Sequence, residues 1–350
     1  MSKLREKWGA FILCAQLIAN ISVCANAEQL SRLTVDDANS RWRINATIDD
    51  SLMDAHLMSA QCTETIDIDA AAALLLSSDE KSRAKREKID YSCYNRAGSY
   101  YEAIDIRVDG NDGIDAELFS YPGSFSYSRS FPVSYKRSDY EDGYGVISSD
   151  GIAANCSLSK DEAHKKAEAL LNKLDIPFTY KISSVVAYSP TNETYLTVGF
   201  YEVYFQQVIS GVPVAIYNCL PYRENPGTPT FYPEYSYGIT VRVFDSGVYS
   251  IKCEWLETAE KTGSQAALLP LSQAVDIFSA YFVDHPSADI SPKPMQIDSI
   301  CLEYAVCGSA DAYLLIPSWT FSGDRNQTMF YGLRISAVDG STILFDGNKQ

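Results

Sequence analysis

The C-terminal part of the chain contains a diverged internal duplication, which constrains the fold more than any other feature of the sequence. Residues 237–245 (YGITVRVFD) align without a gap with residues 331–339 (YGLRISAVD), and both segments start with Tyr-Gly and end with Asp. Each copy has a helical pattern followed by alternating strand patterns, and such alternation is typical of antiparallel sheets. The sequence therefore predicts an α+β protein with two diverged α-β-β-β modules built on antiparallel sheets.

The first copy begins with a capping box, in which Ser159 and Glu162 satisfy the first helical N–H groups. Strands are expected at residues 180–188, 195–208 and 239–243, and the last of these turns back into a strand at 248–256. The apolar stripe of the helix is Ala163, Ala167, Leu170, Leu171 and Leu174. One face of the final strand is expected to carry Tyr249, Ile251, Cys253 and Trp255.

The second copy repeats this order. Ser272 is expected to cap its helix, and strands are expected at residues 296–306, 312–321, 333–337 and 341–345. The apolar stripe of this helix is Ala274, Val275, Phe278, Tyr281 and Phe282. The helix starts lie 113 residues apart and the turn aspartates Asp245 and Asp339 lie 94 apart, so the first copy holds a 19-residue insertion. Residues 218–236, rich in Pro and Tyr, supply it as a loop.

Residues 28–150 have a different pattern and are expected to form a separate N-terminal α+β domain. A strand is expected at residues 42–48, a helix at 69–89, and a hairpin from 103–108 and 114–119 around the turn 109–113. The predicted organisation is a signal peptide at 1–27, this domain at 28–150, the first module at 151–260 and the second at 261–350.

The first 27 residues have the composition of an export signal. A basic start and a short apolar core at residues 10–23 precede Ala25-Asn26-Ala27, a small-residue cleavage site. Two alternatives would leave the chain attached to a membrane: an uncleaved helical anchor, or lipidation of Cys24 at a sequence close to a bacterial lipobox. All three predict an extracytoplasmic protein, either secreted or attached to a Gram-positive cell surface.

Acidity limits the partners that the chain can bind. The net charge of the 350 residues is −16, and removal of residues 1–27 would leave 26 basic and 44 acidic residues. Nucleic-acid affinity depends on Lys and Arg, so a nucleic-acid partner is not expected.

Seven cysteines would remain without a C-x-x-C motif, and their disulfide pairing is left open.

Three segments of the duplicated half resemble known families. Residues 312–321 (AYLLIPSWTF) and 335–340 (ISAVDG) resemble the "yxLvPxWxF … INAxDG" ending of an uncharacterised family of exported lipoproteins from clostridial gut bacteria. Residues 205–214 (FQQVISGVPV) resemble a hairpin of PepSY-like and YycI/YycH-like extracytoplasmic domains. Ser336 departs from the usual Asn, and the lipobox is poor. Over residues 157–346 the resemblance implies PepSY/YycI-like modules without established activity. The YycI-like relatives imply a membrane sensor kinase as partner, and the PepSY-like ones a protease.

Catalytic motifs are absent from the sequence. It has no H-E-x-x-H, G-x-S-x-G, phosphate-binding loop or dinucleotide fingerprint, and its histidines are His56, His164 and His285. No catalytic, cofactor-binding or metal-binding residue is assigned, and no cofactor is expected. A secreted hydrolase stays an alternative because a Ser-His-Asp or Cys-His site is recognised by geometry rather than by chain order.

Two charged clusters allow two interpretations each. Oxygen ligands gather at Asp109, Asn111, Asp112, Asp115 and Glu117, which suits either calcium or a solvated hairpin turn. Basic residues gather at Lys81, Arg83, Lys85, Arg86 and Lys88, which suits either an anionic polymer or the C-terminus of a solvated helix. In both cases we favour the second interpretation.

Aromatic residues crowd the inserted loop and its borders, and we expect this loop to bind the partner. They are Tyr217, Tyr222, Phe231, Tyr232, Tyr235 and Tyr237. The hypothesis that we favour is a non-enzymatic exported protein that contacts or regulates an envelope protein. The alternative is a carbohydrate- or cell-wall-binding module that uses the same loop. The oligomeric state is left open.

Overall fold

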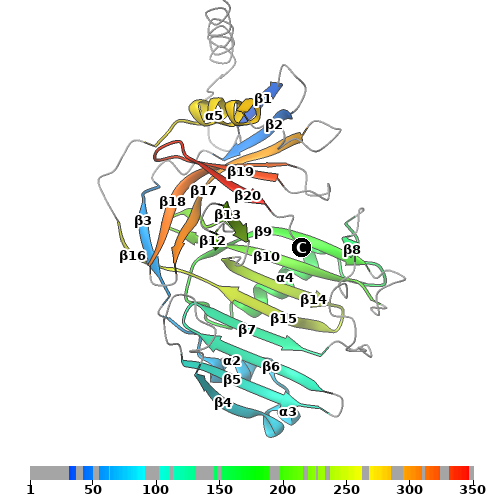
Figure 1. Cartoon of the computed structure of the whole chain (residues 1–350). Helices are drawn as coiled ribbons and strands as arrows, with labels where there is room; N and C mark the ends of the chain where they lie inside the picture. Colours follow the sequence, from blue (N-terminus) through cyan, green and yellow to red (C-terminus); the bar gives the residue numbers. More distant parts are fainter. Residues whose placement is uncertain are drawn as a thin grey trace, which may run out of the picture.

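The computed structural model describes residues 31–36, 42–49, 55–62, 64–90, 102–110, 113–130, 146–147, 151–189, 198–215, 220–225, 228–232, 237–261, 268–284, 295–309, 312–323 and 331–346. These residues form a ten-stranded sheet, an eight-stranded sheet and a two-stranded hairpin, with strands that are mostly antiparallel. In Figure 1 the ten-stranded sheet fills the lower part of the view, and the eight-stranded sheet lies above it. This mixture of antiparallel sheets and few helices is compatible with the expected α+β class.

The ten-stranded sheet contains the strands of the first copy. Its order is β4-β5-β6-β7-β15-β14-β10-β9-β8, with β11 paired to β10. Helix α4 (Lys160–Leu171) packs on one face through Ala163, Ala167 and Leu171, and its predicted capping box is confirmed. The strands are β4 (Lys85–Asp90), β5 (Glu102–Asp109), β6 (Ile114–Tyr121), β7 (Ser124–Arg129), β8 (Val146–Ile147), β9 (Tyr180–Ser189), β10 (Phe200–Ile209), β11 (Val212–Pro213), β14 (Gly238–Phe244) and β15 (Gly247–Glu254).

The eight-stranded sheet contains the strands of the second copy. Its order is β1-β2-β17-β18-β19-β20, and β3 joins β16 to β18. Helix α5 (Leu271–Asp284) packs on this sheet, where Phe278 stacks on Phe321 with ring centres 4.5 Å apart. The strands are β1 (Ser31–Asp36), β2 (Trp42–Asp49), β3 (Met58–Gln61), β16 (Glu257–Lys261), β17 (Met295–Ser309), β18 (Ala312–Gly323), β19 (Tyr331–Ser336) and β20 (Thr342–Asp346).

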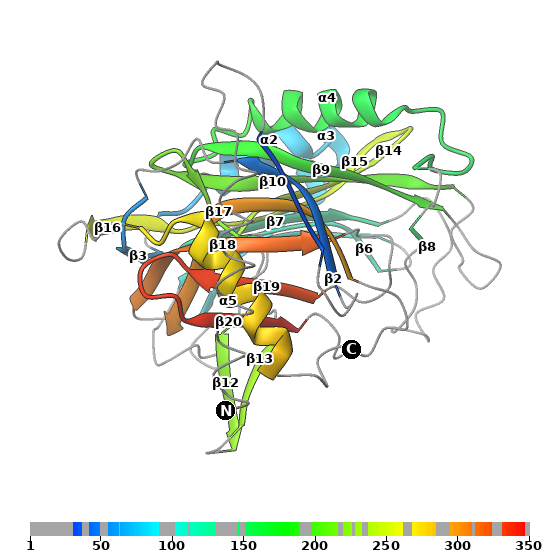
Figure 2. The same cartoon turned by 90° about the horizontal axis from the view of Figure 1, so that it is seen from above.

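The two copies have the same order of elements. In the first, α4 precedes the antiparallel series β9-β10-β14-β15, and in the second, α5 precedes β17-β18-β19-β20. Each series runs through neighbouring strands, so each copy is a helix followed by an antiparallel meander. Figure 2 shows that α4 and α5 lie on different sides of the ten-stranded sheet.

Strands from the N-terminal 150 residues join both large sheets. Strands β1, β2 and β3 belong to the eight-stranded sheet, where β2 pairs in parallel with β17. Strands β4 to β7 extend the ten-stranded sheet, because β7 pairs with β15. The predicted hairpin is formed by β5 and β6. The described strands of this region are therefore parts of the two large sheets, because β2, β3 and β7 pair with strands of the two copies.

The single helix predicted at residues 69–89 is wrong, because the segment forms two short helices and then a strand. Helix α2 (Ile68–Leu75) ends at Leu76, and α3 (Ser78–Arg83) starts with a new capping box formed by Ser77 and Glu80. Residues 85–90 then form strand β4, whose backbone pairs with β5. The strand partner supplies hydrogen bonds that override the helical propensity of a Lys/Arg-rich segment.

Two smaller expectations are also wrong. Helix α5 begins at Leu271, before Ser272, because the Pro270 carbonyl accepts the Ala274 N–H at 3.2 Å and so closes the first turn. Tyr249 leaves the face of Ile251, Cys253 and Trp255 and packs instead beside Phe200 and Phe244. The register between β14 and β15 shifts at Arg242/Val243, and this bulge turns Tyr249 to the opposite face.

Candidate functional site

The inserted loop forms a separate two-stranded hairpin. Strand β12 (Leu220–Asn225) pairs antiparallel with β13 (Thr228–Tyr232), with Leu220 opposite Tyr232 and Tyr222 opposite Thr230. The hairpin contacts β17 and β20 of the eight-stranded sheet. In Figure 2 it extends away from both large sheets. Three predicted contact residues, Tyr222, Phe231 and Tyr232, therefore lie on the strands of one projecting element, while Tyr217 and Tyr235 lie outside the described residues.

Tyr237 does not belong to this surface, which corrects the expectation. It is 4% exposed, and its ring lies 6.1 Å from that of Tyr313 in the core of the eight-stranded sheet. Burial, with the neighbouring Tyr313, raises the pKa of the Tyr237 hydroxyl well above its ordinary value. Tyr237 therefore fixes the C-terminal end of the inserted segment in the core and is not available to a partner.

The segment that resembles PepSY-like domains forms the β10–β11 hairpin, and it reaches from one large sheet into the other. Ser210 and Gly211 form its turn with φ angles of 51° and 84°. Left-handed angles at both positions are typical of a tight two-residue hairpin turn. Beyond the turn, Val212 and Val214 are buried in the core of the eight-stranded sheet. The hairpin thus belongs to the ten-stranded sheet by its pairing, while the residues after its turn pack into the core of the eight-stranded sheet.

A buried polar cluster lies beside this hairpin. Glu303 and Arg334 are 4% and 5% exposed, and Arg334 Nε lies 3.2 Å from Glu303 Oε1. The Thr320 hydroxyl donates to the same oxygen at 2.7 Å. Sequence reasoning missed these residues, although a glutamate within the apolar strand pattern at 300–307 was a signal that could have been used.

A second buried carboxylate, Glu202, lies on β10 of the ten-stranded sheet. Glu202 accepts hydrogen bonds from Arg242 Nε at 2.5 Å and from the Tyr204 hydroxyl. Arg242 also lies over the Phe200 ring at 5.9 Å from its centre. Burial and the adjacent Glu202 raise the pKa of Tyr204. Since both oxygens of Glu202 have partners within the sheet, this group is committed to holding β10 and β14 together.

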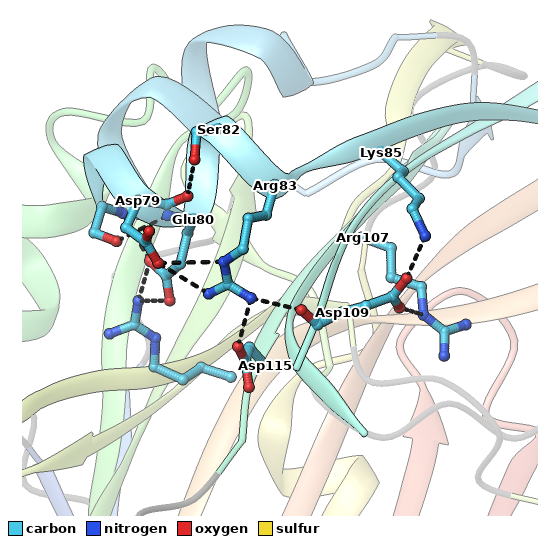
Figure 3. A network of polar contacts seen from close by, with 10 residues as sticks. Asp79, Glu80, Ser82, Arg83, Lys85, Arg107, Asp109 and Asp115 are labelled. Atoms are coloured by element: carbon cyan, nitrogen blue, oxygen red, sulfur yellow. Dashed lines mark hydrogen bonds and ion pairs between the residues drawn. The ribbon is translucent and has the colours of Figure 1, made fainter. Parts of the chain in front are cut away.

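Most cations of the basic run are paired with carboxylates around α3, β4, β5 and β6, and Figure 3 shows two of them, Arg83 and Lys85. Arg83 bridges Asp79 at 3.2 Å and Asp115 at 3.0 Å, and Lys85 lies 2.6 Å from Asp109. Arg86 pairs with Asp69, Lys88 pairs with Glu102, and Lys81 donates to the Ala73 carbonyl. Each cation has a protein partner, so this corner offers an anionic polymer little uncompensated charge.

The same ion pairs involve the acidic residues of the β5–β6 hairpin. Asp109 lies 3.2 Å from Arg107 as well as beside Lys85, and the hydrogen bond from Lys85 lowers the pKa of Asp109. Asn111 and Asp112 lie outside the described residues. Among the residues that are described, no group of three or more His, Cys, Asp or Glu side chains is arranged to hold a metal ion.

Histidine and cysteine positions bear on the hydrolase alternative. The His56 backbone N–H donates to the Tyr304 hydroxyl at 3.3 Å, and the His164 ring lies 5.9 Å from that of Phe205. Cys253 is fully buried, and burial raises the pKa of its thiol. His285 and Cys24 lie outside the described residues.

Within the described part of the chain, no helix is long and apolar enough to cross a membrane.

Comparisons with known proteins identify a similar fold. No family of known sequences matches the chain, and no curated protein is similar to it. Among solved structures, the chain is similar to the 1.45 Å crystal structure of an uncharacterized protein from Eubacterium rectale ATCC 33656. The TM-score is 0.57 at 14% sequence identity, over 90% of this chain and 94% of that one. At this identity the similarity concerns the fold alone.

Proposed function

We propose that the protein is an exported, non-enzymatic interaction protein that contacts an envelope protein through the β12–β13 hairpin. The observation that carries this proposal is the place of the hairpin in the duplicated fold. It lies between β10 and β14, whereas only residues 324–330 join the equivalent strands β18 and β19 of the second copy. The meander of the second copy forms without such an element, so the hairpin is available for another role.

The composition of the hairpin supports a protein partner. Aromatic residues such as Tyr222, Phe231 and Tyr232 supply large contact areas at a low cost in side-chain entropy, and tyrosine is enriched where proteins bind one another. The acidity of the whole chain disfavours anionic cell-wall polymers. A membrane sensor kinase or an envelope protease is the partner that the PepSY/YycI-like resemblance suggests.

Affinity capture from envelope extracts tests this proposal. The full chain is compared with a variant in which residues 218–236 are replaced by a short Gly/Ser linker, and with the double variant Tyr222→Ala/Tyr232→Ala. The control is Lys88→Gln, which removes an exposed ion pair between β4 and β5 at one edge of the ten-stranded sheet. We expect the full chain and the control to enrich the same envelope protein, and both hairpin variants to lose it with unchanged circular dichroism.

Two results would count against the proposal. Equal capture by the full chain and the hairpin variants would place the contact elsewhere. Hairpin-dependent binding to purified cell-wall polysaccharide, without capture of a protein, would support the carbohydrate-binding alternative instead.

A further inference from the structure

Two consecutive glutamines on β10 contact the neighbouring sheet or the chain that leads to it. Gln207 is 1% exposed, and its Nε2 donates to the Leu256 carbonyl at 2.5 Å while its Oε1 accepts the Leu256 N–H at 3.0 Å. The side-chain amide thus pairs with Leu256 as a neighbouring strand would. Leu256 lies between β15 of the ten-stranded sheet and β16 of the eight-stranded sheet. Gln207 therefore fixes the chain where it passes from the ten-stranded sheet to the eight-stranded sheet.

Gln206 makes a polar contact directly between the sheets. Its Nε2 donates to Glu303 Oε2 at 3.2 Å and lies 3.4 Å from the Val214 carbonyl. The other oxygen of Glu303 accepts from Thr320 and Arg334, which belong to the eight-stranded sheet. Glu303 therefore uses one carboxylate oxygen within its own sheet and the other toward the ten-stranded sheet.

Backbone and apolar contacts lie around this polar bridge. The Ala215 N–H donates to the Tyr304 carbonyl at 2.9 Å, and Val214 forms an isolated bridge with Tyr304. Ile209 and Val212 are buried in the same core as Tyr304. Because the buried Glu303–Arg334 pair has lost its hydration, it depends on every remaining hydrogen bond, and the one from Gln206 exists only while the sheets are docked.

We infer that Gln206, Gln207 and Glu303, together with the β10–β11 hairpin, form an inter-sheet lock that makes the two copies unfold as one cooperative unit. The lock also holds the inserted segment in place, because Ala215 is bonded to Tyr304 before that segment and Tyr237 is buried after it. The inference concerns the joint alone and does not depend on which partner the hairpin binds.

The test is hydrogen exchange by mass spectrometry along a urea series, which follows each sheet separately. In the wild-type protein we expect peptides from β10 and β14 and peptides from β17 and β18 to lose protection at one urea concentration. In Glu303→Gln we expect the eight-stranded sheet to open first, with the two midpoints separated by on the order of 1 M urea. Gln206→Ala removes the contact to Glu303 and the longer one to the Val214 carbonyl but leaves the Glu303–Arg334 pair in place, so it is expected to separate the midpoints by less.

The matched control is Glu202→Gln, which breaks a buried ion pair within the ten-stranded sheet alone. We expect it to lower both midpoints together. The inference would be overturned by two midpoints in the wild-type protein, or by a common shift in both Glu303→Gln and Gln206→Ala. If Glu303→Gln does not fold, Gln206→Ala decides between these outcomes.

Discussion

At the scale of single residues, aligned positions of the two copies have acquired different roles. Asp245 and Asp339 occupy the same turn of the repeat, but their carboxylates bond to different parts of the chain. Asp245 accepts the Ser157 N–H at 2.8 Å and the Leu158 N–H at 3.2 Å, just before α4. Asp339 accepts the Ser341 N–H at 3.0 Å within its own turn. The first aspartate therefore joins two elements, whereas the second stabilises only a local turn.

We predict that Asp245→Ala destabilises the protein by about 1–2 kcal/mol, because backbone N–H groups lose their acceptor. Asp339→Ala is the matched control and should cost less. Hydrogen bonds, the largest from the Ser157 N–H, lower the pKa of Asp245 in the folded state. The stabilisation is therefore present above the unfolded pKa of about 3.9 and is lost as the pH falls through the folded pKa. Urea unfolding at pH 7 and pH 3 measures both effects, and equal losses in the two variants would contradict the prediction.

For Asp105 we expect the opposite dependence of stability on pH. Its Oδ1 is buried without a hydrogen-bond partner among the described residues. Burial, and to a smaller extent the negative charge of Glu117, raises the pKa of the Asp105 carboxyl group. Ionised Asp105 therefore destabilises the folded state, and the penalty disappears as the pH falls below the unfolded pKa. We expect Asp105→Asn to stabilise the protein by on the order of 0.5–1 kcal/mol at pH 7 and not at pH 3, measured by urea unfolding. Destabilisation at pH 7 would contradict this expectation.

At the scale of elements, capping residues set the helix boundaries more firmly than composition does. The Ser159–Glu162 box starts α4 as expected, while the equivalent Ser77–Glu80 box divides a segment that reads as one helix. The signal for that division was present, since Ser77 precedes Glu80 by three residues. The strand that follows, β4, could not be identified in the same way, because its pairing with β5 is a non-local contact.

The charged corner of α3 and β4 leads to a prediction about polyanions. Because its cations have partners within the protein, mostly carboxylates, we expect no retention of the protein on heparin at physiological ionic strength. The double variant Lys85→Gln/Lys88→Gln should elute identically, and neither substitution should change the stability appreciably, as is usual for exposed ion pairs. Retention of the wild-type protein that disappears in the double variant would instead support the anionic-polymer interpretation.

At the scale of the whole molecule, the N-terminal strands complete both sheets. Strand β7 covers the edge of β15, β2 covers the edge of β17, and β3 lies between β16 and β18. Exposed edges of central strands are templates for aggregation. The two copies are therefore not independent of residues 31–129.

We predict that residues 151–350 expressed alone do not form a folded, soluble protein, because β15, β16, β17 and β18 then lose strand partners that lie before residue 151. Size-exclusion chromatography and near-ultraviolet circular dichroism check the prediction against residues 28–350 as the control. A monodisperse 151–350 chain with native-like near-ultraviolet signal would show that the copies fold without the N-terminal strands.

The sequence by itself determined the order of the elements within the two helix-plus-meander copies and the position of the insertion. These follow from periodicity and caps, which are local properties of the chain. Only the tertiary structure decided that residues 31–129 are shared between two sheets, that Tyr237 is buried, that the basic run is paired and that Glu303 connects the sheets. Strand pairing is made by backbone groups that are nearly alike in every residue, so the choice of partner is encoded in packing across the whole molecule rather than in any one segment.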